Sequence, residues 1–121
     1  LWDARHQIHM GDCAEETATR FKLSRQAQDE YATESYKRAA KAWASGQFAQ
    51  EIVPVEIKDR KGNVTKVSED EEFKRVDFAK LGQLKPAFSP TGTITAANAS
   101  TLNDGAAALL LMHDAEAARL G

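Results

Sequence analysis

The sequence lacks most of the features that mark secreted, membrane-spanning and nucleic-acid-binding proteins. Among its 121 residues Cys13 is the single cysteine, so no disulfide can form within the chain, which suits a reducing compartment. The longest apolar run, Ala106–Met112, is far shorter than the roughly 20 residues of a bilayer span. The net charge of −2 gives no electrostatic reason to bind nucleic acid or an anionic membrane. We therefore expect one modest soluble domain with no membrane and no nucleic-acid partner. The Leu1–Arg5 start has neither an initiator Met nor a signal-peptide pattern, so we expect it to be a processing or cloning boundary.

Two segments in the first half have helical patterning. Asp12 precedes Glu15 by three residues, as in a capping box, and predicts an amphipathic helix over about residues 13–22. Ser24 is a good N-cap for a second helix with small and apolar residues on one face, and Gly46 is a plausible stop.

The pattern then changes to that of strands. Ile52–Ile57 is rich in β-branched residues, Arg60–Asn63 is turn-like, and Val64–Val67 predicts a returning strand, so we expect a hairpin with Pro54 on an edge strand. Residues 69–84 are strongly charged and show no periodicity, which predicts irregular surface structure.

The last third combines turns with one wholly apolar run. Thr93–Thr95 has an extended pattern, and Ala106–Met112 follows a turn. Such a run predicts a strand buried on both faces of an α/β sheet, although its alanines leave a helix as the alternative. Asp114 can cap a final helix over Ala115–Leu120. The buried strand needs sheet neighbours that the chain does not supply, which indicates a missing partner layer.

Four segments, in order, resemble the thiolase family, and they cover nearly the whole chain. The longest is GTITAANASTLNDGAAA at residues 92–108, which is similar to a thiolase signature. The others are Ile8–Gly11 with Ala14-Glu15, Ser24-Arg25 and Gln28-Asp29 with Ser35-Tyr36, and Asp70–Asp77. Within the family, the chain is most similar to the biosynthetic, potassium-using mitochondrial type.

The resemblance implies a part of an α/β thiolase fold. Residues 1–91 would form most of a helical, loop-rich insertion domain that binds coenzyme A. Residues 92–121 would supply a buried strand and a helix of the N-terminal α/β layered half. Together they would be an internal piece of a larger enzyme, expected to be a homotetramer in the mitochondrial matrix or, alternatively, the cytoplasm.

The implied activity is that of an acetyl-CoA C-acetyltransferase, which interconverts two acetyl-CoA with acetoacetyl-CoA and coenzyme A through a cysteine acyl-enzyme. The family's catalytic cysteines, and its Asn-Glu-Ala-Phe and Gly-His-Pro segments, are expected outside this chain, which should not catalyse alone. The alternative is a non-catalytic module that binds coenzyme A or a thioester.

The resemblance also implies which residues contact coenzyme A. For the charged ones, the alternative is a solvated face that balances Glu69–Glu72. For the apolar ones, it is ordinary core packing. His9 and Met10 would line the pocket without transferring protons, while His6 and His113 are expected at the surface. The implied contacts are Leu1, His9, Met10, Tyr36, Arg75, Val76, Asp77, Lys80, Ala87, Phe88 and Ser100.

A potassium site is implied at Tyr36 with the backbone carbonyls of Ala96, Ala97 and Ala99. Potassium is commonly held by main-chain carbonyls, which requires a tight loop of small residues. One further carbonyl would come from outside the chain. The ion would stiffen the loop that holds coenzyme A.

Cys13 invites assignment as the nucleophile, because a cysteine near a helix N-terminus can have a lowered pKa. Its neighbours Asp12, Glu15 and Glu16 oppose thiolate formation. In the thiolase family the nucleophile lies upstream of the insertion domain, so we expect Cys13 to be structural or incidental.

Overall fold

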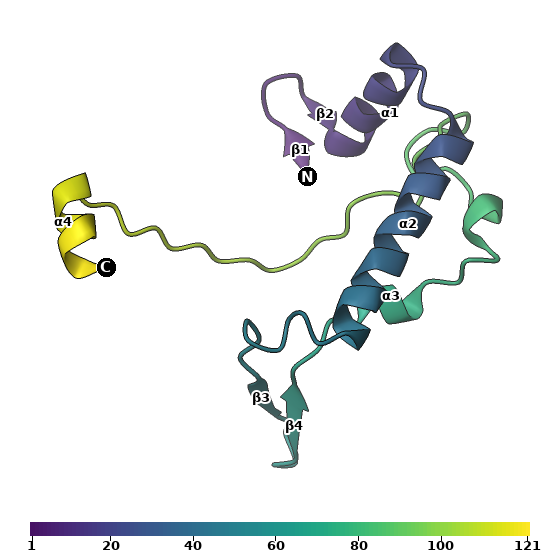
Figure 1. Ribbon diagram of the computed structural model, residues 1–121. Helices are drawn as coiled ribbons and strands as arrows, with labels where there is room; N and C mark the ends of the chain where they lie inside the picture. The colour runs from purple at the N-terminus through teal and green to yellow at the C-terminus, as the bar shows by residue number, and fades with distance from the viewer.

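Two helices, α1 and α2, form the framework of the chain in this computed structural model, which describes all residues from 1 to 121 (Figure 1). α2 extends over Arg25–Ala44, with the Ser24 hydroxyl accepting a hydrogen bond from the amide of Ala27 at 3.1 Å. Gly46 follows with a φ of 72°, in the left-handed region that favours glycine after a helix. The predictions of the Ser24 cap and of the stop near Gly46 are confirmed.

α1 extends over Met10–Arg20, and its predicted start at residue 13 is wrong. His9 is the N-cap instead of Asp12, because its backbone is extended and its Nδ1 accepts the amide of Gly11 at 2.9 Å. A histidine ring nitrogen here supplies the acceptor that the capping-box pattern assigns to Asp12.

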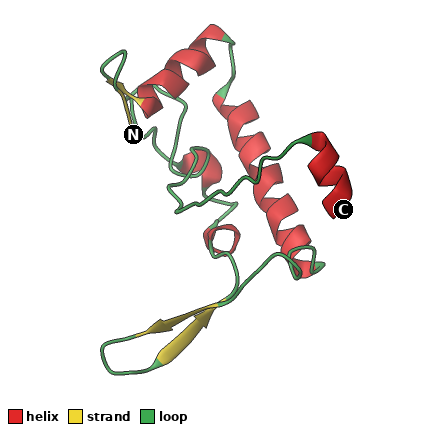
Figure 2. Cartoon of the chain, turned by 90° about the vertical axis from the view of Figure 1, so that its left-hand side faces the viewer, coloured by secondary structure: helices red, strands yellow, loops and turns green.

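Two small antiparallel sheets flank the helices. β1 (Trp2–Asp3) pairs with β2 (Ile8–His9) just before α1. β3 (Val55–Lys58) pairs with β4 (Val64–Val67), with Val55 opposite Val67 and Lys58 opposite Val64. This confirms the predicted hairpin, which Figure 2 shows projecting away from the helices.

The charged segment 69–84 is more ordered than the sequence predicts. It contains α3 (Glu72–Arg75) and the 3-10 helix η1 (Leu81–Gln83). Aromatic contacts hold it to α2: Trp43 stacks on Phe73 at a centroid distance of 6.2 Å, and Tyr36 meets Phe78 edge-on at 6.5 Å. Leu81 is buried. Apolar anchors spaced along the charged run, rather than any periodicity, give the segment its structure.

The buried strand predicted for Ala106–Met112 does not form within this chain. Residues 100–113 contain neither helix nor strand, and Leu109, Leu110 and Leu111 are 84–89% exposed. Figure 1 shows this segment running away from the helices to α4 (Asp114–Leu120). A strand requires a neighbour for its main-chain groups, and neither hairpin lies beside it. The missing partner layer remains a prediction.

Two smaller predictions near the C-terminal end also differ. Thr93–Thr95 is not part of a sheet, because a glutamate side chain takes the place of a partner strand, as described below. α4 begins at Asp114, and the exposed His113, not Asp114, is its N-cap. None of the helices combines the length and apolar character that crossing a membrane requires.

Only 5 of the 121 residues are buried, so the core is too small to account for the order of the loops. The buried side chains Ala18, Ala32, Leu81 and Thr95 lie where α1, α2, η1 and the loop after residue 92 meet. Polar contacts at this junction must therefore hold the loops in place.

Candidate functional site

The carboxylate of Glu15 anchors the segment that follows Gly92. It accepts hydrogen bonds from the amide of Thr93 at 2.8 and 3.0 Å, from the amide of Ile94 at 2.9 Å, and from the Thr93 hydroxyl at 3.3 Å. Partial burial, the largest influence, raises the pKa of Glu15, but the Thr93 and Ile94 donors together outweigh it and lower the pKa below its ordinary value. A Cβ on Gly92 would lie 2.2 Å from Glu15 Oε1, so this close approach needs glycine.

The Ala96–Ala99 turn is held from within by Asn98 and Thr95. Asn98 Oδ1 accepts the amide of Thr95 at 2.7 Å, and its Nδ2 donates to the carbonyl of Thr93 at 3.0 Å. The Thr95 hydroxyl accepts the amides of Ala97 and Asn98, both at 3.3 Å, and the Thr95 carbonyl accepts the amide of Ala99. Thr95 is fully buried. The amide hydrogens of the turn therefore point inward.

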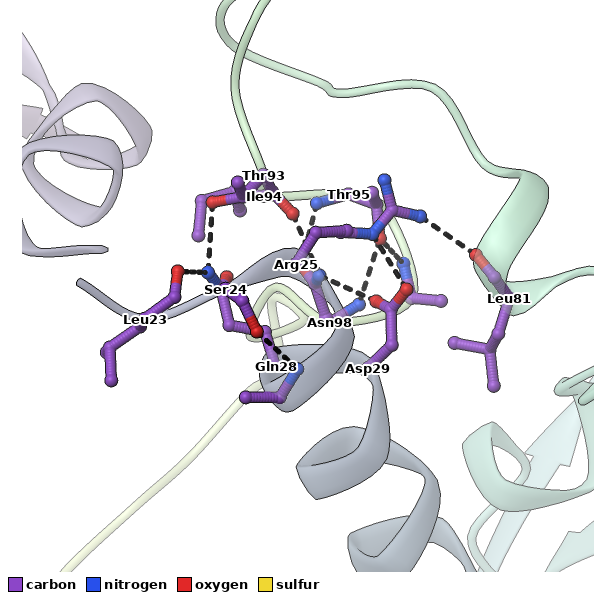
Figure 3. Close-up of polar contacts among 12 residues, drawn as sticks. Leu23, Ser24, Arg25, Gln28, Asp29, Leu81, Thr93, Ile94, Thr95 and Asn98 are labelled. Carbon is purple, nitrogen blue, oxygen red and sulfur yellow. Dashed lines mark hydrogen bonds and ion pairs between the residues drawn. The ribbon is translucent and has the colours of Figure 1, made fainter. Parts of the chain in front are cut away.

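The first turn of α2 connects this turn to η1 (Figure 3). Arg25 and Asp29 form an ion pair at 2.7 Å between Nε and Oδ2, with side chains 24% and 13% exposed. Asp29 Oδ1 accepts Asn98 Nδ2 at 2.9 Å, and an Arg25 terminal nitrogen donates to the Leu81 carbonyl at 2.9 Å. Gln28 adds a bond to the Thr93 hydroxyl at 2.9 Å. No buried side-chain polar atom in the structure lacks a partner.

Tyr36 and the Ala96–Ala99 turn face a common cavity of about 270 Å³. Ala97, Ala99 and Ser100 also line it, whereas Ala96 does not. A second cavity of about 510 Å³ includes Tyr36, Arg75 and Leu102 in its lining. The structure thus brings five of the predicted site residues together around Tyr36.

The chemistry of this cavity fits a large monovalent cation. The carbonyl oxygens of Ala96, Ala97 and Ala99 accept no hydrogen bond. Partial burial, followed by the nearby Glu72 charge, raises the pKa of Tyr36, so its hydroxyl is a neutral oxygen donor. No cluster of three His, Cys, Asp or Glu side chains that could hold a metal ion occurs in the structure. The carbonyl and hydroxyl oxygens are neutral donors of the kind that potassium accepts, and the Glu72 carboxylate, which also lines the cavity, adds a negative charge.

The predicted cations are exposed and already paired with neighbours on their own segment. Arg75 pairs with Glu71, and Lys80 pairs with Asp77 at 2.8 Å. The neighbouring Lys74, which was not assigned a contact, pairs with Glu69 at 2.5 Å. The hydrogen bond between them lowers the pKa of Asp77 and raises that of Lys80. These pairs are what the solvated-face interpretation expects, but exposed ion pairs are weak and leave the cations available to an anionic ligand. Val76, between Arg75 and Asp77, is half-buried.

A separate group of predicted residues gathers at the start of α1. The rings of His9 and Phe88 stack at a centroid distance of 5.1 Å, and a Cβ on Gly11 would lie 2.3 Å from the Phe88 ring. Leu1 and Met10 are joined by a backbone hydrogen bond of 3.1 Å, and both side chains are exposed. Ala87 donates its amide to the Ile94 carbonyl at 2.8 Å, which ties this group to the loop that Glu15 anchors.

Comparison with known proteins identifies the family to which this chain belongs. Residues 1–115 match the model of the thiolase N-terminal domain. The chain belongs to the thiolase family. It is 55% identical over 121 residues to the mitochondrial acetyl-CoA acetyltransferase of Mus musculus, covering 99% of the chain and 28% of that protein. It is 53% identical to the acetyl-CoA acetyltransferase of Yarrowia lipolytica, covering 100% of the chain and 30% of that protein. The chain thus spans under a third of the length of these curated relatives.

Solved thiolases have the same fold. The acetyl-CoA acetyltransferase of Bacillus anthracis superimposes with a TM-score of 0.80 at 43% identity, covering 86% of this chain and 26% of that one. A thiolase of Ascaris suum, solved in complex with coenzyme A, gives a TM-score of 0.75 at 45% identity, again covering 86% and 26%. The predicted α/β thiolase fold is confirmed for this segment of the family.

The polar junction of this thiolase segment was missed by sequence reasoning. Glu15, Arg25, Gln28, Asp29 and Asn98 all lie within the segments that carry the thiolase resemblance. The sequence pattern gives Glu15 only a place in a capping box, and it gives the other four no role in a polar junction. Their position within those matching segments was the one sign in the sequence that could have identified them. Cys13 is partly buried on α1 and does not line the Tyr36 cavity.

Proposed function

We propose that this chain is the coenzyme A-binding part of an acetyl-CoA C-acetyltransferase whose catalytic residues lie outside it. The observation that carries the proposal is the convergence of Tyr36, Arg75, Ala97, Ala99 and Ser100 on two adjoining cavities. Coenzyme A has anionic phosphates and a long pantetheine arm, so its site needs exposed cations beside a channel of small residues. Arg75 and Lys80 supply the cations, and the Ala96–Ser100 segment supplies the small residues.

The reaction of the whole enzyme would be a two-step Claisen condensation and its reverse. A cysteine thiolate takes the acetyl group from one acetyl-CoA and releases coenzyme A. A second acetyl-CoA loses a proton from its methyl carbon to a second cysteine, and the enolate attacks the acetyl-enzyme, giving acetoacetyl-CoA and the free thiolate. The residues of this chain hold the same ligand in both half-reactions, so they act through binding and orientation.

A potassium ion bound between Tyr36 and the carbonyls of Ala96, Ala97 and Ala99 would supply positive charge that fixes the turn beside Ser100. The free carbonyls and the neutral hydroxyl of Tyr36 support this assignment. We further propose the division into a coenzyme A-binding loop domain over 1–91 and a return into the N-terminal half over 92–121. The names of several relatives support a mitochondrial location, and we place the protein in the matrix from the family resemblance. A homotetramer is likewise proposed from the family resemblance alone.

Kinetics of Arg75→Ala in the intact protein that contains this chain test the coenzyme A assignment. Arg75 would contact the ligand equally in ground and transition states, so the KM for coenzyme A in thiolysis of acetoacetyl-CoA should rise several-fold with little change in kcat. Arg60→Ala, in the exposed β3–β4 turn, is the charge-matched control. An equal KM for Arg75→Ala and the wild type would refute the contact.

Potassium titration of Tyr36→Phe tests the ion site. We expect a weaker dependence of turnover on potassium, with Thr19→Val, which removes an exposed hydroxyl on α1 outside the Tyr36 cavity, as the control. Identical titrations would refute the assignment. If the intact protein binds coenzyme A with no acetyl transfer, the chain instead belongs to a non-catalytic binding module.

A further inference from the structure

Two of the segments proposed to hold coenzyme A are joined by a continuous chain of hydrogen bonds. The chain runs from the Leu81 carbonyl to Arg25, from Arg25 to Asp29, and from Asp29 to Asn98. Leu81 directly follows Lys80, and Asn98 lies between Ala97 and Ala99. Figure 3 shows Arg25 and Asp29 between Leu81 and Asn98, at the start of α2. Leu81 lies 56 positions from Arg25 in the sequence, and Asn98 lies 69 positions from Asp29. One turn of α2 thereby holds both distant segments.

Asp29 is the junction of this chain, because its two carboxylate oxygens serve different partners. Oδ2 receives Arg25 Nε at 2.7 Å, and Oδ1 receives Asn98 Nδ2 at 2.9 Å. The side chain is only 13% exposed, so both bonds are shielded from water and are stronger than exposed pairs. No neutral side chain of this size has two equivalent acceptor oxygens.

Asn98 links Asp29 to the main chain of the Ala96–Ala99 turn. Its Oδ1 binds the Thr95 amide and its Nδ2 also reaches the Thr93 carbonyl, so the side chain replaces main-chain partners on the inner side of the turn. The carbonyls of the adjacent alanines accept no hydrogen bond and stay available for a ligand. Rotation of the Asn98 side chain would break its bonds to the Thr95 amide and the Thr93 carbonyl, which close the inner side of the turn.

We propose that Arg25, Asp29 and Asn98 form a positioning relay that sets the Ala96–Ser100 segment relative to Lys80, so that the two contacts with coenzyme A are energetically coupled. This inference rests on the proposed function. The relay residues touch neither ligand nor reacting atoms in this scheme. They act through Lys80 and Ser100 by fixing the separation across which one coenzyme A molecule is gripped.

Asp29→Asn in the intact protein is the primary test. The carboxamide retains one acceptor oxygen and can serve Arg25 or Asn98 but not both. We expect the KM for coenzyme A to rise about three- to tenfold, as for the loss of one net hydrogen bond, with kcat at saturating substrate within about twofold of the wild type. Glu34→Gln is the matched control, because Glu34 forms an ion pair with Arg38 on the same helix but faces solvent.

A double-mutant cycle distinguishes positioning from general loss of structure. If the relay acts through Lys80, the KM effects of Asp29→Asn and Lys80→Ala will be less than multiplicative, since each removes part of the same grip. The same two substitutions should have additive effects on the free energy of unfolding. Should Asp29→Asn fold poorly, Arg25→Lys carries the same prediction, because a single ammonium group lacks the guanidinium fork that binds both Asp29 and the Leu81 carbonyl.

The outcomes separate the two proposals. A wild-type protein that fails to bind coenzyme A in calorimetry overturns the proposed function and the relay with it. A wild-type protein that binds coenzyme A, with an unchanged KM in Asp29→Asn or fully multiplicative effects in the cycle, overturns the relay alone. A raised KM, preserved kcat and non-multiplicative coupling support it.

Discussion

Replacing Glu15 by glutamine removes the main anchor of the segment after Gly92 while conserving size. The carboxylate receives two backbone amides and, more weakly, the Thr93 hydroxyl. A hydrogen bond to a charged group contributes about 1.5–3 kcal/mol net, against about 1 kcal/mol for a neutral one. The carboxamide keeps one acceptor and turns an N–H group toward a donor. We therefore expect Glu15→Gln to destabilise the closed loop by about 2–4 kcal/mol.

Hydrogen exchange of the Thr93 and Ile94 amides measures this local effect directly. Both amides are protected by Glu15, so a loss of about 2 kcal/mol or more should accelerate their exchange about 30-fold or more, detectable in peptides covering residues 89–98. Glu16→Gln is the control, because Glu16 is the exposed neighbour on the same helix. Unchanged exchange in Glu15→Gln, or equal acceleration in Glu16→Gln, would refute the reasoning.

The same anchor should respond to acid. Because the pKa of Glu15 is lowered in the folded state, its contribution to stability is complete above the ordinary glutamate value of 4.5. It is lost as the pH falls from there through the lower folded-state pKa. Exchange at Thr93 and Ile94, corrected for intrinsic rates, should accelerate in the wild type over this window and stay flat in Glu15→Gln.

Two further substitutions test the local geometry. Gly11→Ala places a Cβ 2.3 Å from the Phe88 ring, so we expect a loss of about 1–3 kcal/mol in chemical denaturation, whereas Gly82→Ala, where a Cβ meets nothing within 4 Å, should be close to neutral. Ser24→Ala removes the N-cap bond of α2 and should cost about 1 kcal/mol in the same assay, against no loss for the exposed mid-helix Ser35→Ala. Equal midpoints for either substitution and its control would contradict the contact concerned.

Features set by near neighbours in the chain could be predicted from the sequence. Ser24 and Gly46 define the ends of α2 because an N-cap and a left-handed residue act within one helical turn. The β3–β4 hairpin was predicted from the turn-like residues 60–63, and in the structure the Asp59 carboxylate accepts the amides of Lys61 and Asn63 in this turn. The thiolase fold was predicted from the resemblance of whole segments, not from any single residue.

Features set by distant contacts could not be predicted in this way. Glu15 and Thr93 are 78 residues apart, and nothing in their local sequences identifies them as partners. The Cys13–Lys22 helix prediction began too late because His9 is an uncommon cap. Ala106–Met112 has the composition of a buried strand, but burial depends on neighbouring strands that these residues do not contain. The cavities show where several of the site residues lie, but their roles stay predictions that ligand-binding measurements would test.

The exposed run Ala106–Met112 has a consequence for handling this chain by itself. These seven successive apolar residues are uncharged and contain no proline, and their main-chain groups are free to pair, which are features of segments that assemble into intermolecular β-sheets. Copies of the isolated chain should therefore self-associate through this run as concentration rises. Inside a larger thiolase, a neighbouring strand would pair with these main-chain groups and cover the apolar side chains. The run that would attach this segment to the rest of the enzyme is therefore also the part of the isolated chain most prone to aggregate.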